Sequence, residues 1–307
     1  MAIRYDNKVA IVTGAGNGLG RSHALGLAAR GAKVVVNDLG AALDGSGSTL
    51  GAAELVVEEI RAAGGEAIAN GANVTMPDEV QAMVESATAK WGRVDILVNN
   101  AGILRDKSFS NMSLDDFRLV MDVHLMGSTI CSKAVWDLMK EQQYGRIVMT
   151  SSSSGLYGNF GQANYGAAKM AVVGLMNVLH LEGAKHGIRI NALAPTAATR
   201  MMEGLLAQDN LDLMTVESVT AGLLYLVGEE APSRLVLCAG AGGYAATRIY
   251  ETRGICLLPE EQTPENIALN IEQILNTSTQ TMLQQGGDQT MKFIARAAEK
   301  QGIVFSS

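Results

Sequence analysis

Short apolar runs alternate along the chain with longer stretches in which apolar residues follow a helical spacing. Seven of the short runs are rich in β-branched residues, and we expect them to be strands: Lys8–Thr13, Ala32–Asp38, Glu66–Val74, Val94–Asn99, Gly145–Ser151, Ile188–Ala194 and Leu235–Ala239. Runs such as Val-Val-Val at 34–36 have no polar face, which is typical of strands that helices cover on both sides. The alternation therefore predicts an α/β fold built on a doubly wound parallel sheet.

Two segments fall outside this alternation. A Gly/Ser-rich insertion occupies Gly40–Gly51, and the tail after Gly243 contains helical patterns at Pro264–Asn276 and near Asp288–Lys300. Because no linker-like stretch divides the chain, we expect one domain over residues 1–243. The C-terminal extension, residues 244–307, is expected to pack on this core or on a partner subunit.

Composition narrows the possible classes of function. The 307 residues are 48% hydrophobic and carry a formal net charge of −7 with both signs scattered, so we expect a large core and no nucleic-acid surface. No apolar run reaches the length of a membrane span and the N-terminus has no long apolar leader, which favours the cytoplasm. The cysteines and the remaining histidines have no metal-ligand spacing, so we expect no metal site: Cys131, Cys238, Cys256, His23, His180 and His186.

A glycine-rich turn follows the first predicted strand. It reads Thr13-Gly14-Ala15-Gly16-Asn17-Gly18-Leu19-Gly20 and stands where the next helix begins. Glycines at this point let the backbone approach a pyrophosphate, whose charge then lies at the unpaired N–H groups of a helix N-terminus. The turn favours a Rossmann-type dinucleotide site with Gly14, Asn17, Gly18, Leu19 and Gly20 as cofactor contacts. An ordinary strand-to-helix turn and a methyltransferase loop are the alternatives.

Asp38, at the end of the second predicted strand, favours NAD over NADP. Its carboxylate stands where it can accept hydrogen bonds from the adenosine ribose hydroxyls. A 2′-phosphate about 4 Å away would be repelled by roughly 4 kcal/mol per charge pair before screening. The alternative is a turn-forming Asp that precedes Gly40.

Candidate catalytic residues stand at a fixed spacing in Tyr165-Gly166-Ala167-Ala168-Lys169, thirteen residues after Ser152. Residues i and i+4 share a helix face, so the Tyr165 phenol and the Lys169 ammonium can point into one cleft. A nearby cation favours the phenolate, which makes Tyr165 a candidate acid–base residue. Ser152 follows the fifth predicted strand and can hydrogen-bond a substrate oxygen. The alternatives are that Ser151–Ser154 form only a polar turn, and that Tyr165 and Lys169 only begin a solvated helix.

The chain resembles the short-chain dehydrogenase/reductase family over residues 6 to 240. Thr13–Gly20 matches the family's TGxxxGxG, Asn99-Asn100-Ala101-Gly102 its NNAG, and Tyr165–Lys169 its YxxxK. The resemblance implies that Tyr165 is the acid–base residue, that Lys169 binds the nicotinamide ribose, and that Ser152 positions the substrate oxygen. It also implies further cofactor contacts: Asn73 and Val74 beside the adenine, Asn99, Ala101 and Gly102 around the cofactor, and Pro195 and Thr199 near the carboxamide.

Two positions depart from the family pattern. His124 stands where many members have a catalytic Asn that supports a proton-relay water, and Pro195-Thr196 replaces the usual Pro-Gly. We expect His124 to serve the same water through an imidazole nitrogen, with simple packing as the alternative.

Several segments resemble the (3R)-hydroxyacyl-CoA dehydrogenase domains of peroxisomal multifunctional enzymes of type 2. These segments are His124, Tyr144–Ser151, Tyr157–Tyr165, the insertion after Asn37–Gly40, and Thr263-Pro264-Glu265. The resemblance implies NAD-dependent oxidation of a (3R)-3-hydroxyacyl-CoA to the 3-ketoacyl-CoA, a step of β-oxidation. Because the chain ends at Ser307 without a Ser-Lys-Leu signal, we expect a stand-alone cytoplasmic enzyme.

The sequence leaves the substrate and the assembly open. A 17β-hydroxysteroid or another secondary alcohol would need the same elongated apolar pocket, for which Met201, Met202, Leu205 and Leu206 are candidates. The candidate cations for CoA phosphates are Arg105, Lys107, Arg200, Arg248 and Arg253. A non-catalytic NAD-binding module is a remote alternative, because Tyr165 and Lys169 are both present. The resemblance implies a homodimer.

Overall fold

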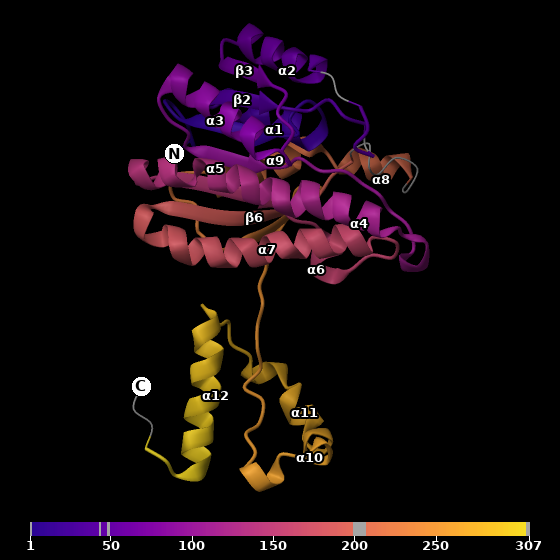
Figure 1. The fold of residues 1–307 in the computed structure, drawn as a ribbon, viewed down its shortest axis with the longest axis vertical. Helices are drawn as coiled ribbons and strands as arrows, with labels where there is room; N and C mark the ends of the chain where they lie inside the picture. Colours follow the sequence, from indigo (N-terminus) through magenta and orange to yellow (C-terminus); the bar gives the residue numbers. More distant parts are fainter. Residues whose placement is uncertain (1, 43, 48–49, 199–206, 305–307) are drawn as a thin grey trace. The chain divides into compact units, whose positions relative to one another are not determined.

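The computed structural model describes residues 2–42, 44–47, 50–198 and 207–304. In these residues eight strands form one sheet in the order β3-β2-β1-β4-β5-β6-β7-β8 (Figure 1). The strands are β1 (Val9–Thr13), β2 (Lys33–Asn37), β3 (Glu66–Asn70), β4 (Ile96–Asn99), β5 (Gly145–Thr150), β6 (Ile188–Thr196), β7 (Val236–Gly240) and β8 (Gly243–Thr247). Neighbouring strands from β3 to β7 pair in parallel, which confirms the predicted doubly wound sheet.

Helices cover both faces of the sheet because successive strand residues point to opposite sides. Along β1, Ala10 and Val12 pack with α1 (Gly18–Ala28), α2 (Gly51–Ala62) and α9 (Val216–Leu226). Val9 and Ile11 pack on the other side with α3 (Pro77–Trp91), α5 (Gly127–Gln142) and α7 (Ala163–Gly183). The strand order reverses between β1 and β4, so a crevice opens at their carboxyl ends.

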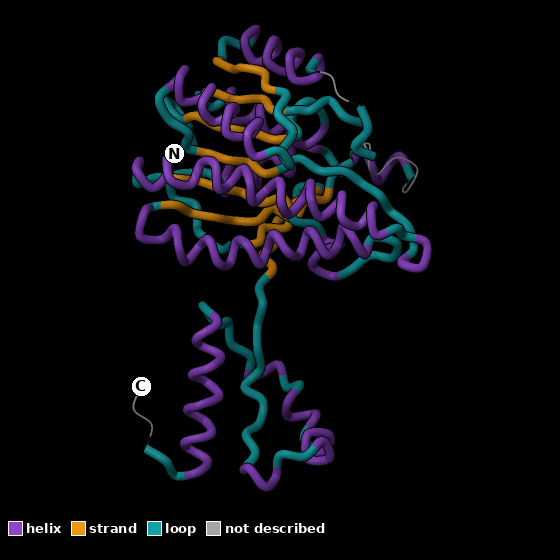
Figure 2. Tube along the Cα trace, in the orientation of Figure 1, coloured by secondary structure: helices purple, strands orange, loops and turns teal. Residues whose placement is uncertain are grey.

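Shorter elements connect these layers. They are the helices α4 (Leu114–Met121), α6 (Ser153–Tyr157) and α8 (Gln208–Leu213), the 3₁₀ turns η1 (Phe109–Asn111) and η3 (Ala184–His186), and the π-helix η2 (Asp122–Met126) between α4 and α5. In Figure 2 the strands lie side by side in this part of the chain.

The structure differs from the sequence prediction at several strand ends, and it contains one strand that was not expected. The strand expected over Glu66–Val74 ends at Asn70, because the Asn70 carboxamide oxygen accepts from the Ala72 N–H at 2.9 Å and forms a turn. β6 continues past Ala194 to Thr196. The sequence did not predict β8, which follows β7 after Ala241 and Gly242, both at positive φ as in a type I′ hairpin turn.

The chain divides into two compact units, Met1–Ala246 and Thr247–Ser307. The second unit contains η5 (Pro259–Glu261), α10 (Pro264–Leu269), α11 (Ile271–Ile274), η6 (Thr277–Thr279) and α12 (Gly286–Gln301). The helix expected over Pro264–Asn276 is broken at Asn270, whose side chain donates to the Asn266 carbonyl at 2.8 Å and competes with the helical pattern.

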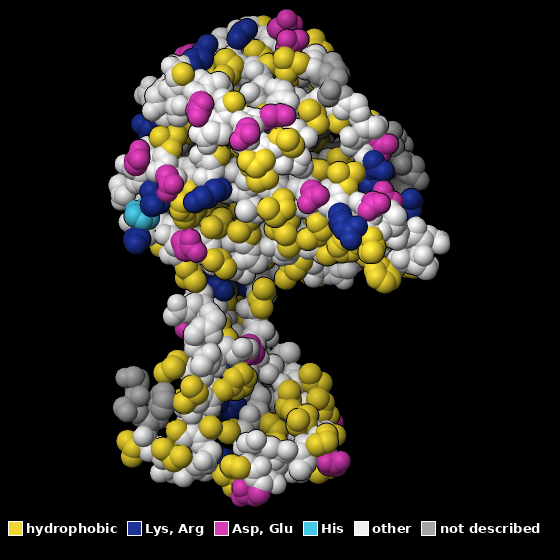
Figure 3. Space-filling model, viewed as in Figure 1, with side chains coloured by type: hydrophobic (Ala, Val, Ile, Leu, Met, Phe, Trp, Pro, Cys, Tyr) yellow, Lys and Arg dark blue, Asp and Glu magenta, His cyan; other side chains and the backbone are white. Residues whose placement is uncertain are grey.

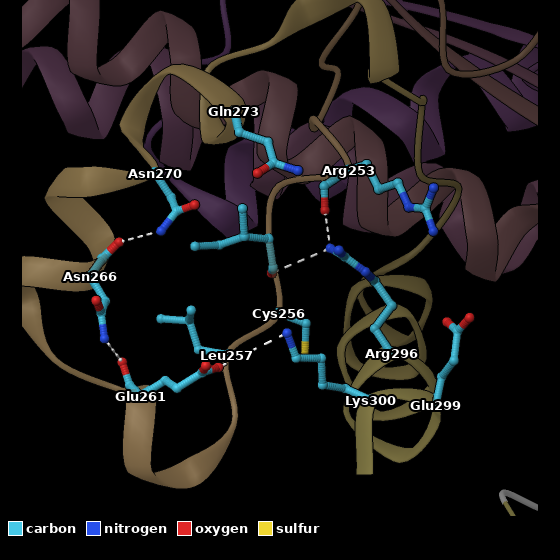
Figure 4. A pocket seen from close by; sticks show the side chains of 11 residues that line it. Arg253, Cys256, Leu257, Glu261, Asn266, Asn270, Gln273, Arg296, Glu299 and Lys300 are labelled. Carbon is cyan, nitrogen blue, oxygen red and sulfur yellow. Dashed lines mark hydrogen bonds and ion pairs between the residues drawn. The ribbon is translucent and has the colours of Figure 1, made fainter. Parts of the chain in front are cut away.

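Polar contacts hold the second unit together. The Arg296 guanidinium on α12 donates to the carbonyls of Arg253, Gly254 and Ile255, and Lys292 pairs with Glu251. Figure 4 shows Arg253 and Arg296 among the residues that line a cavity of about 530 Å³. Among its described hydrophobic side chains only Ala298 is buried, and yellow side chains are spread over its surface in Figure 3.

Candidate active site

A cleft of about 620 Å³ lies at the carboxyl ends of the strands and brings residues from distant parts of the first unit together. The predicted site residues that line it are Gly14, Asn17, Gly18, Leu19, Gly20, Asp38, Asn73, Val74, Ala101, Gly102, His124, Ser152, Tyr165, Lys169 and Pro195. Thr199, Arg200 and the methionine-rich segment after Pro195 lie outside the described residues. The described residues hold no group of three or more His, Cys, Asp or Glu placed to bind a metal ion. None of the described helices has the length and apolar character of a membrane span.

The glycine-rich turn has the geometry that a dinucleotide pyrophosphate needs. Gly14 and Gly18 have φ values of 63° and 52°, in the left-handed region that favours glycine. A Cβ at Gly20 would lie 2.1 Å from the Gly14 carbonyl oxygen. The Asn17 side chain does not cap α1, so the first N–H groups of this helix can bind an anion. The turn therefore fits the phosphates of a dinucleotide.

Asp38 both shapes this turn and lines the cleft. Its Oδ2 accepts from the Gly16 N–H at 2.7 Å, and its Oδ1 accepts from the Gly40 N–H at 2.7 Å. Asp38 therefore also forms the turn before Gly40, which was the alternative interpretation of this residue. Because each carboxylate oxygen has further lone pairs, Asp38 can also accept from ribose hydroxyls.

Ser152, Tyr165 and Lys169 all line the cleft. Ser152 follows β5, and its hydroxyl lowers the pKa of the Tyr165 phenol. Lys169, one turn further along α7, places its ammonium nitrogen 5.5 Å from the centre of the Tyr165 ring. That nitrogen also donates to the Thr150 carbonyl at 2.7 Å. The spacing read from the sequence therefore puts all three polar groups in one place.

Burial controls the protonation of this group. It raises the pKa of the Tyr165 phenol, against the hydrogen bond from Ser152, which lowers that pKa, while the Asp106 charge raises it further. Burial also lowers the pKa of the Lys169 ammonium to about 7. The Lys169 ammonium, which the sequence predicted as the cation beside the Tyr165 phenolate, is therefore only partly protonated near neutral pH.

His124 is buried in the π-helix η2 beside the Tyr165 ring, with the two ring planes at 90° and their centroids 5.2 Å apart. Its Nε2 lies 2.8 Å from the Ile103 carbonyl oxygen and 3.1 Å from the Ile103 nitrogen. Its Nδ1 is buried and has no hydrogen-bond partner within the described residues. Burial and the Lys169 charge hold the His124 pKa well below its usual value, so the ring is neutral at pH 7. The His124 ring thus contacts the Ile103 backbone through Nε2. Its predicted role in binding a proton-relay water remains a prediction.

Asn99 does not line the cleft. Its side chain is buried in β4 and donates to the Ser132 hydroxyl on α5 at 3.1 Å. The neighbouring Asn100 donates to the carbonyls of Thr13 and Gly14, and so ties β4 to the glycine-rich turn. Asn99 thus supports the sheet under the site, and direct contact with a cofactor remains a prediction.

Part of the cleft wall comes from residues that were not expected at the site. Ala41, Ala42 and Gly45 of the insertion line the cleft, and the Asp44 carbonyl accepts from the Arg105 guanidinium at 2.7 Å. Arg105 and Lys107, predicted as cations for CoA phosphates, both pair with Asp116 at 3.1 Å. The contact between Asp44 and Arg105 joins residues that are 61 positions apart, so no local pattern could indicate it.

A family model described as short chain dehydrogenase matches residues 8–210. The chain belongs to the short-chain dehydrogenases. It is therefore an oxidoreductase. The chain is also similar to peroxisomal multifunctional enzymes of type 2, as the sequence predicted. It is 50% identical over 252 residues to the peroxisomal multifunctional enzyme type 2 of Drosophila melanogaster, in a match that covers 82% of this chain and 42% of the fly protein. The chain thus spans less than half the length of that relative.

Two solved structures resemble the dehydrogenase. The full-length fly multifunctional enzyme type 2 superposes with a TM-score of 0.81 at 36% identity, over 97% of this chain and 50% of that chain. A 7α-hydroxysteroid dehydrogenase, solved with NADH and 7-oxo glycochenodeoxycholic acid, superposes with a TM-score of 0.70 at 30% identity, over 78% of this chain and 95% of that chain.

Proposed function

We propose that this short-chain dehydrogenase oxidises (3R)-3-hydroxyacyl-CoA esters to 3-ketoacyl-CoA esters with NAD. The observation that carries the proposal is the meeting of Ser152, Tyr165 and Lys169 with a glycine-rich turn in one cleft. The choice of substrate is supported by the similarity to peroxisomal multifunctional enzymes type 2 of fly and mouse.

In this proposal Tyr165 removes the proton from the substrate hydroxyl, and Ser152 hydrogen-bonds the same oxygen. When bound, NAD supplies the acceptor for the hydride that leaves the carbinol carbon with its electron pair. Gly14 and Gly18–Gly20 would hold the pyrophosphate, and Lys169 the nicotinamide ribose. Asp38 supports NAD over NADP, because a carboxylate with both oxygens fixed toward backbone N–H groups cannot turn away from a 2′-phosphate.

A hydroxysteroid is the second candidate substrate class. The solved 7α-hydroxysteroid dehydrogenase is 30% identical to this chain, and apolar residues such as Leu104, Leu119 and Met214 line the cleft. A module that binds NAD without catalysis is disfavoured, because Ser152, Tyr165 and Lys169 all line the cleft.

The test follows reduced cofactor with NAD and a panel of 3-hydroxyacyl-CoA esters and 17β-hydroxysteroids. The acyl-CoA esters are expected to give the higher kcat/KM. Tyr165→Phe is expected to lower kcat by at least about 100-fold with NAD affinity retained, whereas Tyr225→Phe, a half-exposed tyrosine on α9, keeps full activity. Higher kcat/KM for steroids than for every acyl-CoA ester would refute the substrate assignment, and full activity of Tyr165→Phe would refute the mechanism.

Two further parts of the proposal concern assembly and location. The enzyme is proposed to be a homodimer, with the C-terminal unit packed on its own core or on the partner subunit. The fly and mouse relatives carry the name peroxisomal, whereas the sequence alone favours the cytoplasm, so the location remains a prediction.

A further inference from the structure

A chain of hydrogen bonds beside Tyr165 has no role in the mechanism above. The Ser154 hydroxyl donates to the Gln162 side-chain oxygen at 2.6 Å, and the Asn159 carboxamide donates to the same oxygen at 3.1 Å. The Gln162 amide nitrogen donates to the Asp106 carboxylate at 2.6 Å. All four residues line the cleft.

These partners fix which way the Gln162 amide faces. A carboxylate only accepts hydrogen bonds, so the Gln162 nitrogen must face Asp106, and the Ser154 and Asn159 donors occupy both lone pairs of the Gln162 oxygen. One of the two N–H groups of Gln162 remains without an acceptor within the described residues. Gln162, which lines the cleft, therefore has one N–H group left to donate to a ligand.

The backbone holds Gln162 in place from both sides. Gln162 forms a parallel bridge with Lys107, whose N–H donates to the Gly161 carbonyl at 2.9 Å. The Asn164 side chain donates to the Arg105 carbonyl at 3.0 Å. Because the segment before α7 is joined in this way to the segment after β4, the donor is pre-organised rather than mobile.

The donor lies close to the reacting groups. Ser154, which donates to Gln162, also donates from its backbone N–H to the Ser152 hydroxyl at 3.2 Å. Tyr165 follows Gln162 by three residues at the start of α7, and Figure 1 shows α6 and α7 side by side. A substrate oxygen held by Ser152 and Tyr165 thus brings the neighbouring carbons of the substrate near Gln162.

We propose that Gln162 donates this N–H to the thioester carbonyl oxygen of a 3-hydroxyacyl substrate, and that it selects substrates with a carbonyl group in β-position to the carbinol. The inference rests on the proposed function and names the residue that recognises its substrate class. In a 3-hydroxyacyl thioester one methylene separates the carbinol carbon from the carbonyl carbon, so one substrate can contact Ser152, Tyr165 and Gln162 together. An alcohol that lacks the carbonyl leaves the Gln162 donor without a partner.

The test pairs a protein change with a substrate change. Gln162→Met keeps the side-chain length and removes the donor, and a CoA thioether with a methylene in place of the thioester carbonyl removes the acceptor. The matched control is Gln81→Met, because the exposed Gln81 on α3 also donates to a carboxylate, that of Glu85, at 3.0 Å. Thermal unfolding and NAD affinity of each variant report whether the fold is kept.

We expect Gln162→Met to lower kcat/KM for the thioester about tenfold, through KM, and to leave kcat/KM for the thioether within about twofold. Gln81→Met is expected to change neither. An equal loss for both substrates would overturn the inference, because Gln162 would then only support the loop. If the unchanged enzyme oxidises no 3-hydroxyacyl thioester but oxidises a steroid, the proposed function fails, which the first assay shows before any variant is made.

Discussion

Burial has opposite consequences for two neighbouring side chains at the site. It raises the pKa of the Tyr165 phenol and lowers that of the Lys169 ammonium to about 7, because the low-polarity surroundings disfavour both charged forms. Both side chains line the cleft, so a molecule that enters the cleft changes the surroundings that set these two pKa values.

A substitution at Asp38 tests whether this side chain makes the enzyme prefer NAD over NADP. Asp38→Asn removes the negative charge and keeps the size, so discrimination against a 2′-phosphate should weaken. We expect kcat/KM with NADP relative to NAD to rise at least about tenfold. The variant also loses an acceptor for Gly16 or Gly40, so the free energy of unfolding should fall by about 1 kcal/mol. An unchanged cofactor ratio, equal to that of the surface control Asp78→Asn, would remove Asp38 from cofactor selection.

His23 provides a prediction of stability against pH. The side chain is fully buried between α1 and α9, where its Nδ1 lies 2.8 Å from the Thr220 hydroxyl, and burial lowers its pKa to about 3. In the unfolded chain a histidine binds a proton below about pH 6.5, whereas the folded chain does not protonate His23 until about pH 3. Its stabilising contribution is therefore complete above pH 6.5 and is lost as the pH falls toward 3.

The measurement is urea unfolding at several values between pH 7 and pH 5, a range above most carboxyl titrations. The free energy of unfolding should fall by up to about 1.4 kcal/mol per pH unit through His23 alone. His23→Asn, which does not titrate, should show a correspondingly shallower slope. Identical slopes for the two proteins would mean that His23 takes up its proton in the folded state.

At the scale of elements, the position of the site follows from strand order and from close contact between backbones. The strand order reverses between β1 and β4, and α1 begins at Gly18, soon after β1 ends at Thr13. The π-helix η2 between α4 and α5 presents His124 to Ile103 and Tyr165. A Cβ at Gly102 would lie 2.3 Å from the His124 ring, so the loop after β4 needs a glycine there to pack on η2.

Gly20 tests the contact between α1 and the end of β1. Gly20→Ala puts a methyl group 2.1 Å from the Gly14 carbonyl oxygen, and backbone at both positions must move. We expect at least a tenfold loss of NAD affinity and a loss of stability of about 1–3 kcal/mol. Gly174→Ala on α7 is the control, because nothing lies within 4 Å of its added Cβ. That change should stabilise the helix by roughly 0.5–1 kcal/mol and keep NAD affinity, so equal behaviour of the two variants would contradict the role of Gly20.

At the scale of the whole molecule, the two units differ in how much apolar surface they bury. The first unit contains two large cores, one on each side of the sheet. In the second unit Leu269, Phe293 and Val304 are 81%, 51% and 95% exposed, and the hydrophobic side chains lie on its surface in Figure 3. A unit of this size without its own core depends on another surface for stability.

Separate expression of the two units tests this difference. We expect residues 1–246 to unfold cooperatively and to show the circular dichroism of an α/β protein. Residues 247–307 alone are expected to be largely unfolded at the same temperature, because their contacts are mainly polar. A cooperative unfolding transition of the isolated C-terminal fragment would contradict the prediction.

The sequence by itself determined seven of the eight strand segments in the described residues, the parallel sheet and the spacing that places Tyr165 and Lys169 in one cleft. These features rest on local rules, since β-branched runs form buried strands, glycines permit the turn, and a four-residue spacing puts Tyr165 and Lys169 on one helix face. These patterns can be recognised in the sequence without any knowledge of contacts between distant residues. Element ends were less certain, as the break at Asn270 shows, because one side-chain hydrogen bond can end a helix.

Only the tertiary structure decided how the remaining groups act. The partner of His124 is Ile103, and the donor of Gln162 is oriented by Asp106, 56 residues earlier in the chain. The charge of Lys169 at neutral pH depends on burial by many elements at once. Hydrogen bonds between distant segments and the exclusion of water are properties of the packed chain, so no spacing along the sequence contains them.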